Sequence, residues 1–148
     1  MKQLSLGTLA PDFTLPALDG STFRLQDALA GGPLVLAFFK VACPTSQFTL
    51  PYLQKSGQPR IWLISQDDPA DTVAFMERFG LSLPVLLDEH PYAVSAAYDI
   101  EYVPAIFEIG PQGMIRVSDY AFSKATLSKI AGFDMFPGDD GIPATRPG

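Results

Sequence analysis

One stretch constrains the chain most: an uninterrupted apolar run, Leu34–Phe39, is followed after three residues by Cys43 and Pro44. Such a run of apolar and aromatic residues predicts a fully buried strand. Pro44 has the backbone angle suited to the first position of a helix. Cys43 is the only cysteine of the chain and is therefore expected where a buried strand meets a helix N-terminus. Backbone N–H groups and the helix dipole favour negative charge there, so the sequence predicts a reactive thiolate.

Length and composition limit the class of protein. With 148 residues, 47% of them hydrophobic, residues 1–148 are expected to form one domain with a core of ordinary size. The net charge of −6 gives no attraction to nucleic acid or to anionic membranes as partners. One cysteine excludes an internal disulfide. Together with a single histidine it leaves no credible metal site, and no cofactor is expected.

No apolar run reaches the length of a signal peptide at the N-terminus, and none later reaches the length of a membrane span. This pattern favours a cytoplasmic location. A secreted or periplasmic protein whose leader has been removed has the same pattern. The sequence gives no basis for predicting an oligomeric state.

Strand and helix signals alternate along the rest of the chain. Strands are expected at residues 13–15, 22–25, 59–65, 103–109 and 114–117, and a short strand or an extended connection at 83–87. Helices are expected at Pro44–Lys55, 68–80, 92–98 and 123–132, and a single helical turn at 26–30. Val73, Met76 and Phe79 recur at helical spacing. This order predicts an α/β fold, a mixed central sheet with helices on both faces plus an N-terminal hairpin. Residues 133–148, rich in Pro, Gly and Asp, are predicted to lie irregularly on the surface.

Three segments stand out in this order: residues 7–15 read GTLAPDFTL, residues 38–46 read FFKVACPTS, and residues 98–104 read YDIEYVP. Their arrangement resembles the thioredoxin superfamily. The closer similarity is to its redoxin group, the AhpC/TSA peroxiredoxins and TlpA-like thiol-disulfide oxidoreductases. The resemblance implies a thioredoxin-like fold. It also implies that Pro104 is a cis-proline, with the Val103 backbone beside Cys43 where an extended substrate pairs, and Pro44 in the substrate site. An ordinary trans-proline is the alternative.

The active-site segment departs from both branches of the redoxin group. Dithiol members need Cys-X-X-Cys, because the second thiol resolves the mixed disulfide of the first. Position 46 is serine here. Peroxiredoxins carry a proline and a hydroxyl residue seven and three residues before the reactive cysteine, where this chain has Leu36 and Lys40. The short spacing from Phe39 to Cys43 matches TlpA-like proteins, so the resemblance implies their geometry with one thiol.

Four side chains are candidate catalytic groups. Cys43 is either the nucleophile or a buried structural cysteine. Ser46 is an ordinary first-turn residue, a remnant of a lost resolving thiol or an introduced replacement, and its hydroxyl could bond the Cys43 thiolate. Lys40 either favours the thiolate electrostatically or is merely solvated. Thr45 is a helix-start residue that could also polarise a substrate.

Three functions follow from these residues. The favoured one is a redoxin-type thiol oxidoreductase, in thiol-disulfide exchange or as an antioxidant, with Cys43 resolved by an external thiol such as glutathione, another small thiol or a partner protein. The second is a one-Cys peroxidase, which needs Lys40, Thr45 or the distant Arg116 to polarise a peroxide. The third, from another class, is a binding module that holds partners at the Val103–Pro104 edge without turnover.

Overall fold

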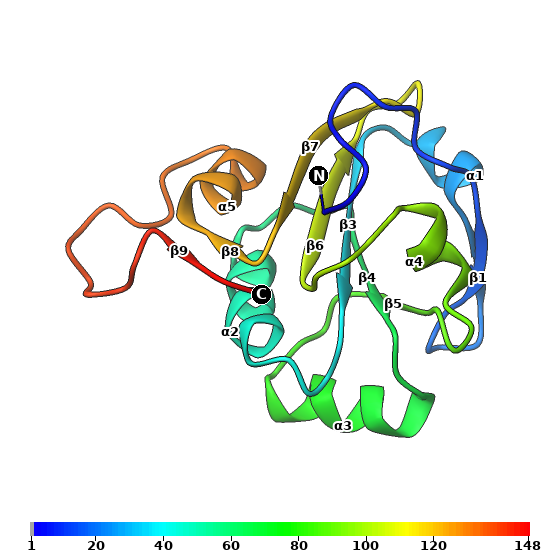
Figure 1. The fold of residues 1–148 in the computed structure, drawn as a ribbon, viewed down its shortest axis with the longest axis horizontal. Helices are drawn as coiled ribbons and strands as arrows, with labels where there is room; N and C mark the ends of the chain where they lie inside the picture. The colour runs from blue at the N-terminus through cyan, green and yellow to red at the C-terminus, as the bar shows by residue number, and fades with distance from the viewer. Residues whose placement is uncertain (1) are drawn as a thin grey trace.

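The computed structural model describes residues 2–148, and Figure 1 shows a central sheet with helices on both faces. The elements follow the order β1 (Thr14–Pro16), β2 (Thr22–Arg24), α1 (Leu25–Leu29), β3 (Leu34–Phe39), α2 (Pro44–Lys55), β4 (Ile61–Ser65), α3 (Pro69–Arg78), β5 (Val85–Leu87), α4 (Ala93–Ala97), β6 (Ala105–Ile109), β7 (Ile115–Tyr120), β8 (Phe122–Ser123), α5 (Lys124–Ala131) and β9 (Thr145–Arg146). Over residues 2–148, no helix combines the length and apolarity that a membrane span needs.

The central sheet is mixed, as predicted. Within the described residues it has five strands in the order β5-β4-β3-β6-β7. Strands β3, β4 and β5 run parallel, whereas β6 pairs antiparallel with both β3 and β7. Strands β1 and β2 form a separate antiparallel hairpin, which confirms the predicted N-terminal addition. Strand β3 is central and buried at every residue, so its carboxyl end delivers Cys43 to the edge where open α/β sheets place their sites.

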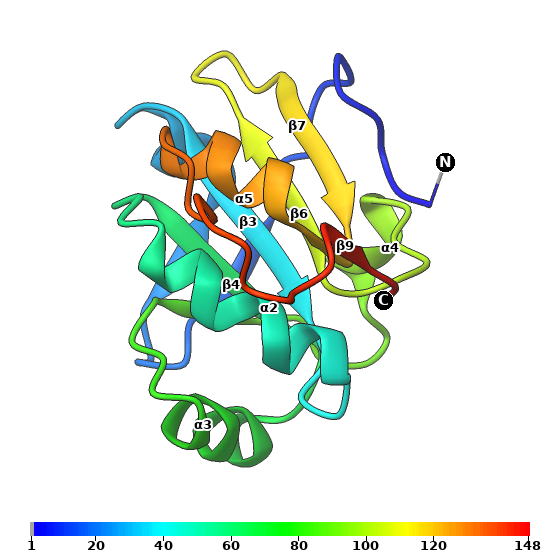
Figure 2. The same ribbon diagram turned by 90° about the vertical axis from the view of Figure 1, so that its left-hand side faces the viewer.

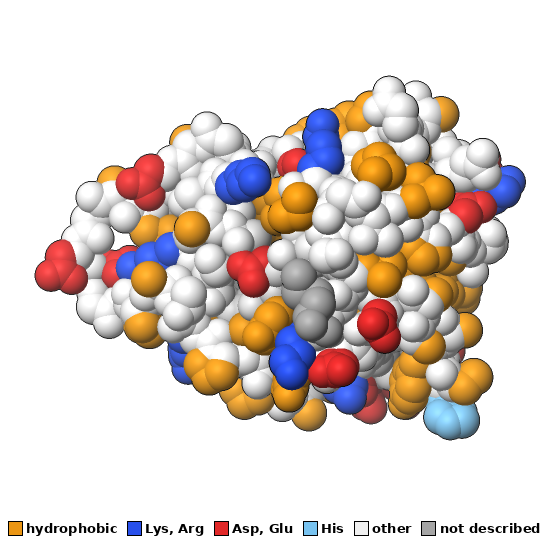
Figure 3. Space-filling view, turned by 45° about the horizontal axis from the view of Figure 1, so that its top comes forward, with side chains coloured by type: hydrophobic (Ala, Val, Ile, Leu, Met, Phe, Trp, Pro, Cys, Tyr) orange, Lys and Arg blue, Asp and Glu red, His pale blue; other side chains and the backbone are white. Residues whose placement is uncertain are grey.

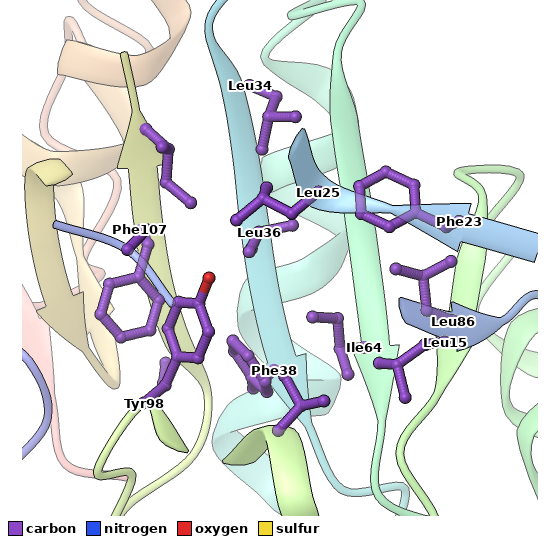
Figure 4. Close-up of a cluster of buried hydrophobic side chains, with 14 of the residues drawn as sticks. Leu15, Phe23, Leu25, Leu34, Leu36, Phe38, Ile64, Leu86, Tyr98 and Phe107 are labelled. Atoms are coloured by element: carbon purple, nitrogen blue, oxygen red, sulfur yellow. The ribbon is translucent and has the colours of Figure 1, made fainter. Parts of the chain in front are cut away.

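The two faces of the sheet bury two apolar clusters. The first cluster packs under the hairpin, α1 and α4, and Figure 4 shows Tyr98 and Phe107 side by side within it, next to Leu36 and Phe38 of β3. The Tyr98 and Phe107 ring centroids are 5.3 Å apart. The second cluster packs between the opposite face and helices α2, α3 and α5. The side chains of β3 point alternately into these two apolar clusters, so every residue of the strand is buried. This explains the uninterrupted apolar run of β3.

Helix α3 presents a different face to the core from the one its periodicity suggested. Asp68 caps it, and the Asp68 side chain accepts the Asp71 N–H at 2.8 Å. The expected stripe began at Val73, but Val73 is 40% exposed. The buried residues of the helix are Thr72, Phe75 and Met76. The buried Thr72 hydroxyl has a partner, the Ser65 hydroxyl at the end of β4, at 2.7 Å.

Tyr98 ties the first cluster to the N-terminal segment. Its ring is fully buried, and its hydroxyl donates to the Pro11 carbonyl at 2.7 Å. Burial raises the pKa of the Tyr98 hydroxyl, and the Asp12 carboxylate adds to this shift. The phenol is therefore protonated at neutral pH and serves as a hydrogen-bond donor.

We expect Tyr98→Phe to lower the free energy of unfolding by about 1 kcal/mol, since it removes one hydrogen bond and keeps the ring. Urea unfolding followed by circular dichroism measures this change. Tyr120→Phe is the matched control, because the Tyr120 ring lies at the surface. Equal stability of Tyr98→Phe and the native protein would contradict the assigned role.

Candidate functional site

Cys43 is the N-cap residue of α2, with Pro44 at the start of the helix. Its Sγ accepts the backbone N–H of Ser46 at 3.4 Å, and the side chain is partly buried. Its own N–H donates to the Lys40 carbonyl at 3.2 Å. The first turn of α2 therefore offers this sulfur one backbone N–H, a donor that a thiolate, the form that reacts, can accept.

The loop before β6 faces the thiol from the other side. The Val103–Pro104 peptide bond is cis, as is that between His90 and Pro91. Cys43 Sγ lies 3.6 Å from the Val103 carbonyl oxygen, to which the thiol donates. The structure therefore brings Cys43, Val103 and Pro104 together, although they are separated by 60 residues in the sequence. This backbone carbonyl next to the sulfur is a group with which an extended polypeptide could pair.

The remaining predicted residues have different surroundings. Ser46 is completely buried, and among the described residues its Oγ has no hydrogen-bond partner, so the expected bond from this hydroxyl to Cys43 is not formed. The Ser46 backbone makes the contact to sulfur instead. The Thr45 hydroxyl donates to the Pro147 carbonyl at 2.5 Å. The Lys40 side chain is exposed at the end of β3.

Two side chains that sequence reasoning did not single out hold the turn before Cys43. The Val41 N–H donates to Asp67 Oδ2 at 2.8 Å. Gln47 Nε2 donates to the Val41 carbonyl at 2.9 Å. Asp67 follows β4, the parallel neighbour of β3, and so lies at the same edge of the sheet. A carboxylate directly after a neighbouring parallel strand is the sequence signal that could have identified it.

The tail, residues 133–148, is more ordered than its composition suggested. It is largely without helix or strand, but its last part contains β9, which pairs antiparallel with β8. Lys124 at the start of α5 donates its N–H to the Ala144 carbonyl at 2.9 Å. Figure 2 shows the tail crossing in front of α2 and ending near the C-terminal end of β7. The tail thus reaches the edge of the sheet that holds Cys43.

Further contacts anchor the tail along its course. The Phe136 ring centroid lies 5.2 Å from that of Tyr52 on α2. Lys124 Nζ pairs with Asp140 at 2.8 Å, and this hydrogen bond holds the pKa of the Asp140 carboxyl below its ordinary value. Met135, Phe136 and Ile142 pack against the second apolar cluster. These apolar residues among the turn-forming ones are the signal that the tail is packed.

The charged side chains on one face of the molecule are mixed in sign. Figure 3 shows acidic and basic side chains interspersed on the face in view, with no broad patch of one sign. Within residues 2–148, no group of three or more His, Cys, Asp or Glu side chains could hold a metal ion.

Comparisons with known proteins identify a family and its relatives. The model of the AhpC/TSA family matches residues 6–118. Thiol-disulfide oxidoreductase ResA of Geobacillus thermodenitrificans (strain NG80-2) is 28% identical over 120 residues, which are 76% of this chain and 68% of ResA.

Solved structures share the fold. A thiol:disulfide interchange protein from Bacteroides sp. superposes with a TM-score of 0.75 at 21% identity, covering 93% of this chain and 95% of that one. Peroxidoxin BcpB from Mycobacterium tuberculosis superposes with a TM-score of 0.71 at 21% identity, covering 86% of this chain and 94% of that one. These likenesses confirm the predicted thioredoxin-like fold. The chain therefore belongs to the AhpC/TSA family, in the redoxin group of the thioredoxin superfamily.

Proposed function

We propose that this protein is a thiol-disulfide oxidoreductase that works through Cys43 alone and depends on an external thiol. The observation that carries the proposal is the position of the sulfur, which accepts the Ser46 N–H and lies 3.6 Å from the Val103 carbonyl. Membership of the AhpC/TSA family and the name of the relative ResA support an oxidoreductase, as the sequence predicts.

The first step is attack by the Cys43 thiolate on one sulfur of a substrate disulfide. A bond forms between Cys43 Sγ and that sulfur, while the substrate S–S bond breaks and the other sulfur leaves as a thiolate. The backbone N–H of Ser46 lies in position to donate to the attacking sulfur in its thiolate form. The Val103 carbonyl would align the substrate backbone beside it.

The second step must use a thiol from outside the chain. The chain has no other cysteine, and the position three residues after Cys43 carries Ser46, whose hydroxyl cannot exchange with a disulfide. A thiolate such as that of glutathione attacks the mixed disulfide at the substrate sulfur, and Cys43 leaves as the thiolate. For a disulfide between a protein and glutathione, attack of Cys43 on the glutathione sulfur frees the protein thiol, and a second glutathione restores Cys43 as oxidised glutathione forms. Atoms and electrons balance in this cycle.

A peroxidase is less well supported by the surroundings of the thiol. A peroxide needs a cation or donor that polarises the oxygen next to the attacking sulfur. Arg116 Nε lies 3.4 Å from Glu108 in an ion pair, and Glu108 is paired with Val35 near the start of β3, the end away from Cys43. Lys40 points to solvent and Thr45 is engaged with Pro147.

Turnover assays with two oxidants test the proposal. With a glutathionylated peptide as substrate, we expect peptide thiol to be released in proportion to protein and glutathione concentrations. With hydrogen peroxide, we expect consumption no faster than by free cysteine. Faster peroxide consumption without disulfide exchange would favour the peroxidase, and a thiol inert to both oxidants would favour the binding module. The expected cytoplasmic location stays a prediction, which the comparisons do not support.

A further inference from the structure

The end of the tail lies directly against the groups that surround the thiol. Pro147 offers its carbonyl to the Thr45 hydroxyl, two residues after Cys43. Gly148 is so close to the loop before β6 that a Cβ added to it would lie 2.6 Å from the Val103 carbonyl oxygen. The same oxygen is the acceptor for Cys43 Sγ. The end of the tail and the thiol therefore both lie next to the Val103 carbonyl.

A side-chain contact fixes the tail in this place. The Arg146 guanidinium lies 4.4 Å from the centre of the Phe48 ring, one helical turn along α2 from Pro44. Cation–π pairs of this kind stabilise a contact in addition to the area that they bury. Arg146 also belongs to β9, which pairs antiparallel with the short strand β8. The segment is thus bound as an extended strand, by main-chain pairing and one anchored side chain.

This manner of binding is the manner in which folded proteins hold extended peptides. Main-chain groups supply hydrogen bonds at a strand edge, and a pocket or ring takes an alternate side chain. Here the edge is β8, the ring is Phe48, and the Thr45 hydroxyl donates to a backbone carbonyl of the tail. A protein substrate that brought a disulfide to Cys43 would have to lay its own backbone along the same groups.

We propose that residues 145–148 occupy a groove for an extended polypeptide, lined by Thr45, Phe48 and Val103, and that a protein substrate must displace this segment to reach Cys43. The inference rests on the proposed function, since it concerns the same thiol. The tail should therefore slow some reagents and not others. A reagent small enough to reach the partly buried sulfur reacts without moving the tail, whereas a peptide disulfide has to compete with the tail for the groove.

Variants of the intact chain test this competition. Arg146→Ala/Gly148→Ala removes the contact with Phe48 and places a methyl group against the Val103 carbonyl. Gly138→Ala is the matched control, because a Cβ there meets no atom within 4 Å. The probes are iodoacetamide and a short peptide whose cysteine carries thionitrobenzoate as a mixed disulfide, from which attack by Cys43 releases coloured thionitrobenzoate.

We expect the double variant to react about threefold to tenfold faster than the native protein with the peptide, because the open groove becomes more populated. Its rate with iodoacetamide and both rates of Gly138→Ala should stay at the native values. Equal peptide rates in the native and double variants would overturn the inference, as would an equal acceleration with both probes. A chain ending at Ala144, checked for folding by circular dichroism, should show at least the same acceleration, and its failure to do so would also overturn it.

These outcomes separate the groove from the proposed function. If no variant releases thionitrobenzoate faster than its Cys43→Ser counterpart, the proposed exchange itself fails. If all of them do so at one common rate, exchange stands and the inference about the tail fails.

Discussion

Replacing Cys43 by serine should reduce disulfide exchange to the uncatalysed rate. A hydroxyl is not appreciably ionised near neutral pH and does not exchange with disulfides, so no mixed disulfide can form. The measurement is release of peptide thiol from a glutathionylated peptide in the presence of glutathione. Because no disulfide holds the fold together, the free energy of unfolding of the variant should lie within about 1 kcal/mol of that of the native protein.

Cys43→Ala serves as the control for the serine variant. Both should be equally inactive, since each lacks the sulfur and neither supplies another nucleophile. A rate in either variant above a few per cent of the native rate would show that exchange takes place elsewhere or on the substrate alone, and would contradict the assignment of Cys43 as the nucleophile.

Ser46→Cys should convert the one-thiol site into a dithiol site. Ser46 stands three residues after Cys43 in the first turn of α2, and its backbone already bonds the Cys43 sulfur. Its hydroxyl is buried without a partner among the described residues, so a thiol of similar size should be tolerated there without loss of stability. Resolution then occurs within the molecule, and we expect it to be at least about tenfold faster than resolution by millimolar glutathione.

Thr49→Cys is the matched control for this gain. Thr49 is also buried on α2, and its hydroxyl has no partner within residues 2–148, but it lies six residues from Cys43. Six residues of helix rise by about 9 Å, which exceeds the Cα separation that a disulfide spans. Free-thiol counts after oxidation should therefore fall to zero in Ser46→Cys and stay at two in Thr49→Cys. An unbridged Ser46→Cys would contradict the site geometry.

The sequence predicted most of the fold because its strongest signals are local. Strand β3 and helix α2 have the predicted bounds, since an apolar run is bounded by the helix-starting Pro44. Helix α5 begins after Ser123 and ends at Gly132, as their capping chemistry implies. The exposed Val73 shows the limit of periodicity, which identifies a helix more reliably than its buried face.

The surroundings of the thiol were predictable only in part, because they depend on contacts between distant segments. The resemblance placed Val103 and Pro104 beside Cys43, as the structure now shows by contact. The covering of this site by residues 145–148 was not predicted. Strand β9 forms by pairing with β8. Arg146 contacts the ring of Phe48, about a hundred residues earlier in the chain. No local pattern of the tail encodes these partners.

The most direct test of the central claim is the intact mass of the protein after reaction with a glutathionylated peptide in the absence of other thiols. We predict one adduct per chain, joined through sulfur to Cys43, which glutathione removes completely to restore the native mass. Absence of the adduct, or an adduct that persists in glutathione, would contradict a one-thiol cycle at Cys43.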